Sequence, residues 1–428
     1  MQRPTDRKKI LVYSHDTFGL GNIRRMLAIT QHLLDTMPEL SVLMISGSPM
    51  IHSFRLPEAR FDYVKLPCLG RTLAGGYSVK RLGTRFDELV AVRSQIIRTT
   101  VAHFKPDVLL VDKKPRGIAD ELLPALEMIR ADQRSPEVVL LLRDILDDPE
   151  TTARIWRKNR YFESIDRYYR SILVMGSPDV FDLRKEYRFP AKTANKVVCC
   201  GYMRRPQPLA PARPAALFPG GKGARVLVTA GGGEDGFELL KQYMDGLSLG
   251  ADRSFSSVVV TGPEMSAANR AVIQDIAKGL GHVRVEEFTR DLPAYMQAAD
   301  LVVSMAGYNT IVELLSMNKR AVVVPRVKPV QEQWIRATRL DELGLLKCID
   351  PAELTPERLL KAVSDELAGR KWRAHPATLI DFDGLTAVSR IIGGMLGHSE
   401  SVPPMTAAAI RQWRVDEDAR AVACSGSW

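Results

Sequence analysis

Cysteine is scarce in this chain, and its spacing excludes most cysteine chemistry. Five cysteines occur among 428 residues, at Cys68, Cys199, Cys200, Cys348 and Cys424. No two of them have the CxxC spacing of a zinc or redox motif, and their number is odd. The pattern predicts reduced thiols, most of them in cores, and it excludes a disulfide-stapled scaffold.

Long apolar runs are also missing. The longest are strand-sized, such as VVLLL at 138–142, and none approaches the length of a membrane span. The N-terminal MQRPTDRKK is basic, but only ILVY follows it before polar residues, too few for the apolar region of a signal peptide. We therefore expect a cytoplasmic location.

Signals for nucleic-acid binding are absent as well, with no zinc-finger spacing, no RNP motif and no basic region joined to heptads. The chain nevertheless carries 60 lysines and arginines against 50 acidic residues, a net charge of +10. Such an excess favours anionic partners, and the handling of phosphates is enough to explain it without a nucleic acid. With 45% hydrophobic and 26% charged residues, the composition is that of a soluble globular protein.

The chain contains two rounds of strand–helix alternation. Short, wholly apolar runs predict buried parallel strands with both faces covered, and amphipathic stretches such as 22–36, 81–103 and 117–130 predict the helices between them. The fold class expected is α/β, with two tandem Rossmann-like, doubly wound domains facing a cleft. The predicted strands are 10–14, 41–46, 107–112, 138–142 and 171–175, and then 225–230, 256–261, 283–288, 300–304 and 320–325.

One segment interrupts the alternation. Residues 203–224 hold five prolines and several glycines, which predicts a stiff, non-helical connector. Two doubly wound domains present the carboxyl ends of their strands to the cleft between them, a natural ligand site. We expect an N-terminal domain at 1–203, a linker at 204–224, a C-terminal domain at 225–398 and a tail at 399–428.

Each expected domain begins with a strand and a glycine-rich turn. Gly19 and Gly21 follow the first strand, and Gly231–Gly233 follow the strand at 225–230. Glycines let backbone N–H groups converge on an anion at a helix N-terminus. Neither turn has the GxGxxG or GxxxxGK[ST] pattern, so dinucleotide and P-loop sites are disfavoured. The alternative is that each turn only allows a helix to pack closely on the sheet.

A third strand end, at 304–313, is richer in polar groups. Gly307 permits a sharp turn, Asn309 and Thr310 are residues typical of a helix start, and Glu313 follows three positions later. Thr310 and Glu313 have the spacing of a capping box, so one interpretation is that Glu313 only stabilises the start of the helix. In the functional reading, its carboxylate accepts hydrogen bonds from two sugar hydroxyls.

The next strand is followed by further candidates. Arg326 is placed to meet an anion, and Glu332 with Gln333 offers an acceptor and an amide near the same cleft. The alternative for Glu332 and Gln333 is an ordinary solvated helix start.

These motifs together resemble glycosyltransferases of the GT-B fold. The segment MAGYNTIVELLSMNKRAVVVPRVKPVQEQWIRATRLDELGL is similar to the nucleotide-sugar segment of glycosyltransferase family 28, which includes the lipid II-forming N-acetylglucosaminyltransferase and monogalactosyldiacylglycerol synthase. A bacterial group of predicted glycosyltransferases carries the elements SHDTFGLG, RDI.D and GYNT.E. Here these stand at Ser14–Gly21, Arg143–Asp147 and Gly307–Glu313, and the resemblance covers roughly 8–398.

The resemblance implies a hexosyltransferase that moves a sugar from a nucleotide-diphosphate donor, a UDP-sugar, to an acceptor hydroxyl. It implies inversion, no metal and no cofactor. The N-terminal domain at 1–203 would bind the acceptor, and the nucleotide-sugar donor would lie mainly against the C-terminal domain at 225–398. There, Gly231–Gly233 would approach the diphosphate, the backbone around Phe288 and Thr289 would meet the base, Glu313 would hold the ribose, and Glu332 and Gln333 the transferred sugar.

One position departs from the pattern. Relatives often have GxGHxxR at the first turn, whereas this chain has Asn22 and retains Arg25. Asparagine can donate a hydrogen bond but cannot act as a base near neutral pH. Either Asn22 has no role in proton transfer, or another residue supplies the base, or activity has been lost.

Several groups at strand ends are candidates for the base. His15 and Asp16 end the first strand and are the leading candidates, ahead of Asp112 and Asp144. Each of them could instead cap a following helix. Asp112, Arg143 and Asp144 belong to the expected acceptor side, and the leaving-group charge would fall on backbone N–H groups and on Arg25 or Arg326.

Two alternatives remain open. A nucleotide-sugar 2-epimerase would share the fold, although its GTRPE-like element is absent, and a sugar-nucleotide-binding protein without turnover would account for Asn22. The acceptor is undetermined among a glycan, a lipid-linked molecule and a small molecule. The stretch 69–86 suits either peripheral contact with the inner membrane face or a flexible loop over the acceptor site.

Overall fold

The structure is a computed structural model. It describes residues 7–15, 21–53, 56–57, 59–71, 76–132, 136–204, 217–219, 223–250, 254–289, 291–369 and 375–397. Asp16, Gly19, most of the expected linker and the whole expected tail therefore lie outside the described residues.

The first sheet is fully parallel and has seven strands in the order β3-β2-β1-β6-β7-β8-β9. Its central strands are apolar on both faces because each face packs on helices. Ile10 and Val12 of β1 enter one core, and Leu11 and Tyr13 enter the opposite one. The strands are β1 (Lys8–Ser14), β2 (Leu40–Ser46), β3 (Phe61–Lys65), β6 (Val108–Asp112), β7 (Glu137–Arg143), β8 (Ser171–Met175) and β9 (Val197–Cys199).

Helices cover both faces of this sheet. On one face lies α1 (Gly21–Thr36), and on the other lie α2 (Phe86–Phe104) and α3 (Leu123–Ala131). A two-stranded antiparallel hairpin, β4 (Leu69–Arg71) with β5 (Tyr77–Val79), precedes α2. The remaining helices are η2 (Ile51–Ser53), η3 (Ile118–Asp120), α4 (Pro149–Lys158), α5 (Tyr161–Tyr168), α6 (Leu183–Glu186) and α7 (Ala191–Ala194).

The second sheet repeats the plan with six parallel strands, in the order β12-β11-β10-β13-β14-β15. Leu227 of β10 faces the core that the second domain shares with the first, and Val226 and Val228 face the other core. The strands are β10 (Ala224–Thr229), β11 (Phe255–Val260), β12 (Val283–Glu286), β13 (Leu301–Ser304), β14 (Ala321–Val323) and β15 (Lys347–Cys348). The helices are α8 (Phe237–Leu249), α9 (Ala267–Ala277), α10 (Leu292–Ala298), α11 (Tyr308–Ser316), α12 (Glu332–Glu342), η5 (Pro351–Glu353), α13 (Pro356–Leu367), α14 (Pro376–Leu379) and α15 (Gly384–Met395).

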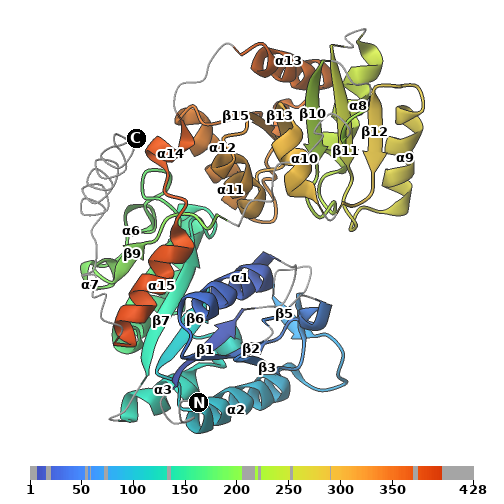
Figure 1. Cartoon of the computed structure of the whole chain (residues 1–428). Coiled ribbons are helices and arrows are strands. Elements are labelled where there is room, and N and C mark those ends of the chain that lie inside the picture. Colours follow the sequence, from blue (N-terminus) through green and yellow to red (C-terminus); the bar gives the residue numbers. More distant parts are fainter. Residues whose placement is uncertain are drawn as a thin grey trace.

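The α/β class and the two doubly wound sheets are as expected, and each predicted strand has a counterpart. The last helix, however, belongs spatially to the first domain, although it falls in the range expected for the second. Val388, Ile392 and Leu396 share a core with residues of α1, and Thr36 Oγ1 lies 3.5 Å from Ser389 Oγ. Figure 1 shows α15 running beside the first sheet.

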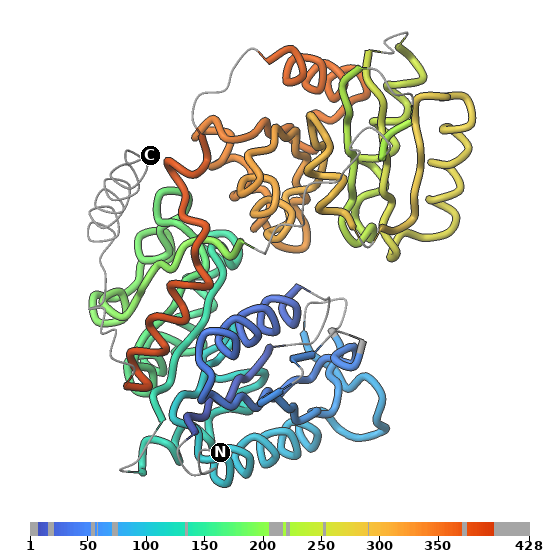
Figure 2. The backbone as a smooth tube through the Cα atoms, viewed as in Figure 1, coloured from blue at the N-terminus to red at the C-terminus, as the bar shows by residue number. Residues whose placement is uncertain are grey.

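The chain passes between the domains twice, at adjacent places. Tyr202 N donates to Asp381 O (2.6 Å), and Gly384 N donates to Tyr202 O (3.1 Å). Gly201 has φ +85°, and a Cβ there would lie 2.9 Å from Asp381, so only glycine fits this crossing. In Figure 2, the orange-red segment that returns from the second domain runs beside the green end of the first domain.

Candidate functional site

Both sheets have a switch point, where the order of strands reverses. In the first sheet it lies between β1 and β6, and in the second between β10 and β13. Ligands of doubly wound sheets bind outside the carboxyl ends of the strands at such points. His15 and Asp112 follow the first pair, and Gly231 and Gly307 follow the second, so the fold places the predicted residues where a ligand is expected.

A buried ion pair links α1 to the end of β6. Arg25 Nη2 donates to Asp112 Oδ1 at 2.5 Å, and the backbone N–H of His15 donates to Asp112 Oδ2 at 3.3 Å. Asn22 Nδ2 donates to the carbonyl of His15 at 3.1 Å. Asp112 is fully buried, so it would have to give up its partners to act as a base. Its geometry is that of an anchor that joins the end of β1 and helix α1 to β6.

His15 has a polar neighbour that the motifs did not point to. Its Nε2 lies 3.4 Å from the hydroxyl of Tyr77 on β5, and Lys114 Nζ donates to that hydroxyl at 2.8 Å. Lysine can only donate, so the Tyr77 hydroxyl accepts from Lys114, and its second lone pair can accept from His15 Nε2–H in the tautomer that leaves Nδ1 as the basic nitrogen. The 69–86 stretch thus includes a hairpin that reaches the candidate base, a role its composition alone did not indicate.

The glycines of the turn after β10, Gly231–Gly233, differ in why a glycine is needed. Gly233 has φ +99°, and a Cβ there would lie 2.5 Å from Thr261 O, so this glycine is required for packing. A Cβ at Gly231 would meet nothing within 4 Å, although its φ of +66° still favours glycine. Packing therefore explains Gly233, whereas Gly231 is open to a ligand. Gly232 lies between them, and a Cβ on it would come 2.6 Å from Glu264 Oε2.

Helix α11 does not begin where a capping box would require. Its N-cap is Gly307 and no side chain caps it, so Asn309 and Thr310 lie within the first turn. The capping-box explanation of Glu313 is therefore wrong, and its half-buried side chain follows one turn later. A Cβ at Gly307 would meet nothing within 4 Å, which leaves open space at this helix N-terminus.

Glu332 and Gln333 are buried, contrary to the solvated-helix alternative, with exposed fractions of 5% and 7%. Gln333 Oε1 accepts a hydrogen bond from Arg326 N at 3.3 Å. Arg326 Nη1 contacts Asp235 Oδ2 at 2.7 Å, and its Nη2 lies 3.6 Å from Glu332 Oε1. The loops after β10 and β14 are thus joined through Arg326.

Burial opposes the ionisation of Glu332, but nearby positive charges outweigh it. The nearest is Arg143 of the first domain, whose Nη2 lies 2.9 Å from Glu332 Oε2. Arg336 and Arg326 add to this field, and the pKa of Glu332 lies below its ordinary value. Even so, Glu332 Oε2, Arg143 Nε and Arg326 Nε form no aligned hydrogen bond with any of the described residues.

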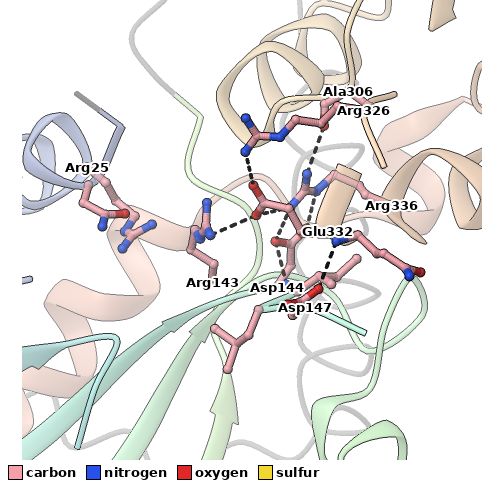
Figure 3. A network of polar contacts seen from close by, with 12 residues as sticks. Arg25, Arg143, Asp144, Asp147, Ala306, Arg326, Glu332 and Arg336 are labelled. Atoms are coloured by element: carbon pink, nitrogen blue, oxygen red, sulfur yellow. Dashed lines mark hydrogen bonds and ion pairs between the residues drawn. The ribbon is translucent and has the colours of Figure 1, made fainter. Parts of the chain in front are cut away.

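Arg143 and Asp144 were expected to face the acceptor, and the structure pairs both with the second domain (Figure 3). Arg336 donates from Nε to Asp144 Oδ2 at 2.7 Å and from Nη2 to Asp144 Oδ1 at 2.9 Å. Asp144 is fully buried, so its use as a base would break this pair. These interdomain pairs were not predicted.

Other interdomain contacts surround this pair. Tyr308 donates to Met175 O at 3.0 Å, and Gln331 N donates to Asp147 Oδ1 at 2.9 Å. Elsewhere in the second domain, Phe288 follows β12 and is 56% exposed, and the Thr289 hydroxyl accepts from Asp291 N at 3.2 Å. The Phe288 side chain is therefore accessible from outside the second domain, and its contact with the base stays a prediction.

Two such domains, joined by a double crossing, have the fold of GT-B glycosyltransferases. Acinetobacter baumannii MurG aligns over 93% of this chain and 96% of its own with a TM-score of 0.54 at 15% identity. A putative UDP-N-acetylglucosamine 2-epimerase from Listeria monocytogenes aligns over 93% and 98% with a TM-score of 0.60 at 14% identity. At such identities the likeness establishes the fold alone.

The sequence comparison is more specific for the second domain. Residues 225–378 match the model of the glycosyltransferase family 28 C-terminal domain, so the chain carries that domain on a GT-B fold. It is similar to the UDP-N-acetylglucosamine--N-acetylmuramyl-(pentapeptide) pyrophosphoryl-undecaprenol N-acetylglucosamine transferase of Methylobacterium radiotolerans, with 38% identity over 85 residues. That match covers 20% of this chain and 23% of the relative. The resemblance to family 28 is confirmed over this domain.

Among the described residues, none of the helices has the length and apolar character needed to cross a membrane.

Proposed function

We propose that this protein transfers a sugar from a UDP-sugar to an acceptor hydroxyl, with inversion and without a metal ion. The observation that carries the proposal is the buried pair Glu332–Gln333 beside Arg326, within the domain that matches family 28. The Glu332 carboxylate is buried, and its contacts among the described residues are ion pairs with arginines, so its oxygens have lone pairs left to accept hydrogen bonds from the hydroxyl groups of a ligand.

The donor would extend from this pair along the carboxyl edge of the second sheet. Gly231 and the N-terminus of α11 at Gly307 have open space, where backbone N–H groups can approach a diphosphate. Glu313 would accept hydrogen bonds from the ribose, and exposed Phe288 would meet the base. Arg326 is better placed than Arg25 to meet the leaving diphosphate, because Arg25 is buried against Asp112.

Transfer would proceed by direct displacement. His15 would take the proton of the acceptor hydroxyl as that oxygen attacks the anomeric carbon. The bond from that carbon to the diphosphate breaks, and its electron pair leaves with the nucleoside diphosphate. Tyr77 would orient His15 by accepting a hydrogen bond from Nε2–H, so that Nδ1 is the nitrogen that takes the proton.

A lipid-linked acceptor is the first class to test, because the Methylobacterium radiotolerans relative is named for a pyrophosphoryl-undecaprenol acceptor. Glycan and small-molecule acceptors remain the alternatives.

A second candidate function is 2-epimerisation of the nucleotide sugar, favoured by the fold likeness to the Listeria monocytogenes protein. Incubating the protein with labelled nucleotide sugars, with and without acceptor mixtures, distinguishes sugar transfer, epimerisation and binding without turnover. We expect acceptor-dependent release of nucleoside diphosphate. Inversion at C2 without an acceptor would favour the epimerase, and binding without turnover would favour a sugar-nucleotide-binding protein.

A further inference from the structure

Two adjacent residues of the first domain, one basic and one acidic, form ion pairs with a single helix of the second domain. Arg143 and Asp144 stand at the end of β7, and Glu332 and Arg336 lie four residues apart on α12. Arg143 pairs with Glu332, and Asp144 pairs with Arg336 (Figure 3). We call these contacts the crossed ion pairs.

The crossed ion pairs differ in how complete they are. Asp144 and Arg336 form two aligned hydrogen bonds, and Arg336 also donates to Ala306 O at 3.0 Å. Arg143 Nη2 and Glu332 Oε2 form an ion pair at 2.9 Å, and within the described part of the chain no aligned hydrogen bond reaches Glu332 Oε2 or Arg143 Nε. The Asp144 pair therefore joins the domains, whereas the Arg143 pair retains unused hydrogen-bonding capacity.

We propose that Arg143 is a positioning residue for the donor sugar. It holds the Glu332 carboxylate from the opposite domain, so that the sugar-binding part of the donor site is complete only when both domains contribute. This inference rests on the proposed function. It goes beyond that function because it assigns recognition of the sugar, and not only of the acceptor, in part to the first domain.

The physical reason lies in the surroundings of Glu332. This carboxylate is buried between guanidinium groups, and Arg143 is the nearest. Without Arg143, the carboxylate has its other strong attractions at Arg326 (3.6 Å) and Arg336 (3.7 Å), and it would shift toward them. A displacement of this kind would misplace the acceptor oxygen for a sugar hydroxyl.

The chain offers a matched control. Arg339, also on α12, reaches the first domain through Glu186 at 3.2 Å, and its other ion pair is with Glu342. Arg339→Gln removes an interdomain arginine without touching Glu332. A purely structural role for Arg143 predicts that both substitutions act alike on ligand binding.

The experiment compares two ligands, UDP and UDP-N-acetylglucosamine, by calorimetry in the full chain. The variants are Arg143→Gln, Arg143→Lys and Arg339→Gln. We expect Arg143→Gln to weaken binding of the UDP-sugar by about tenfold while UDP affinity is unchanged, equivalent to about 1.4 kcal/mol. Arg143→Lys should recover part of the loss, and Arg339→Gln should match the wild type for both ligands.

Each contrary result has a distinct meaning. If the wild type binds the UDP-sugar and Arg143→Gln retains the same ratio of the two affinities, the role of Arg143 is overturned and the proposed function stands. Equal loss for both ligands would also overturn it, because the effect would not depend on the sugar. If wild-type protein binds neither UDP nor UDP-sugars, whichever sugar is tried, the proposed function fails, and this inference fails with it.

Discussion

Arg336 and Asp144, 192 residues apart in sequence, join the two domains through two hydrogen bonds between fully buried side chains. The hydroxyl of Tyr202 also donates to Asp144 Oδ2 at 3.3 Å, so this oxygen accepts a second hydrogen bond beside the one from Arg336. Breaking a buried pair leaves an uncompensated charge, which costs about 3–5 kcal/mol. The pair therefore sets the relative position of the domains.

The first prediction follows from this burial. Asp144→Asn should lower the melting temperature more than Arg339→Gln, because the Arg339–Glu186 pair is partly exposed and exposed pairs contribute about 0–1 kcal/mol. Thermal denaturation of both variants beside the wild type measures the difference. Equal shifts would mean that the Asp144 pair adds little beyond a surface contact.

Glu313→Gln should weaken binding of the nucleotide sugar and leave the fold intact. The loss expected for one charged hydrogen bond is about 1.5–3 kcal/mol. The substitution cannot break a capping box, since Gly307 and not Thr310 caps α11. Calorimetry gives the dissociation constant. Unchanged affinity with a lowered melting temperature would assign Glu313 a structural role.

Glu332 should make stability depend on pH in a defined direction. Its pKa is lowered in the folded protein, so its ionised form contributes stability above the ordinary glutamate pKa, and that contribution is lost as the pH falls through the lowered value. Although burial opposes ionisation, four cations outweigh it, namely Arg143, Arg336, Arg326 and Lys113.

The test compares wild type with Glu332→Gln. The difference in melting temperature should be largest at neutral pH and should shrink as the solution is acidified below the ordinary glutamate range. Glu313→Gln serves as a control, because it removes a carboxylate from α11 instead. A difference that stays constant through the acid range would contradict the assignment.

His15→Ala should lower the maximal rate by about 100-fold or more, with little change in donor affinity, because a general base acts in the transition state. Tyr77→Phe should lower the rate less, since it removes only the neighbour at Nε2. Steady-state kinetics with separate binding measurements resolves the two effects. A wild-type rate in His15→Ala would move the search to Asp16, Asp112 and Asp144.

Transfer should not require a divalent metal. A chelator should leave the initial rate unchanged, because Arg326 and the backbone at Gly231 and Gly307 are placed to meet the leaving diphosphate. Turnover that stops with chelator and returns with magnesium or manganese would contradict this prediction.

The fold was largely predictable because its strands are buried on both faces. Strands such as β7 and β8 contain uninterrupted apolar runs, which the sequence displays directly. Strands β3, β9 and β15 were missed, since FDYVK is interrupted by polar residues, and VVC and KC are too short for any periodicity. Hairpin β4–β5 was missed because its residues do not form an apolar run.

The candidate site was predictable only in part. Strand ends followed by Gly231 and Gly307 are visible in the sequence, and the fold brings them to a switch point. The crossed ion pairs could not be predicted from the sequence. A signal for them is nevertheless present, because Arg143–Asp144 is basic then acidic, whereas Glu332 and Arg336 are acidic then basic. Nothing local links residues so far apart, since their pairing depends on how the two domains meet.

The return of α15 to α1 means that the two halves of the chain are not interchangeable modules. The first domain is discontinuous in sequence, and the second is effectively an insertion between Tyr202 and Asp381, where the two crossings meet. Grafting the donor-binding half of a relative onto this protein would therefore need two junctions, one at each crossing. A hybrid joined once, near residue 224, would instead carry a foreign final helix against α1 and disturb a core that the native α15 completes.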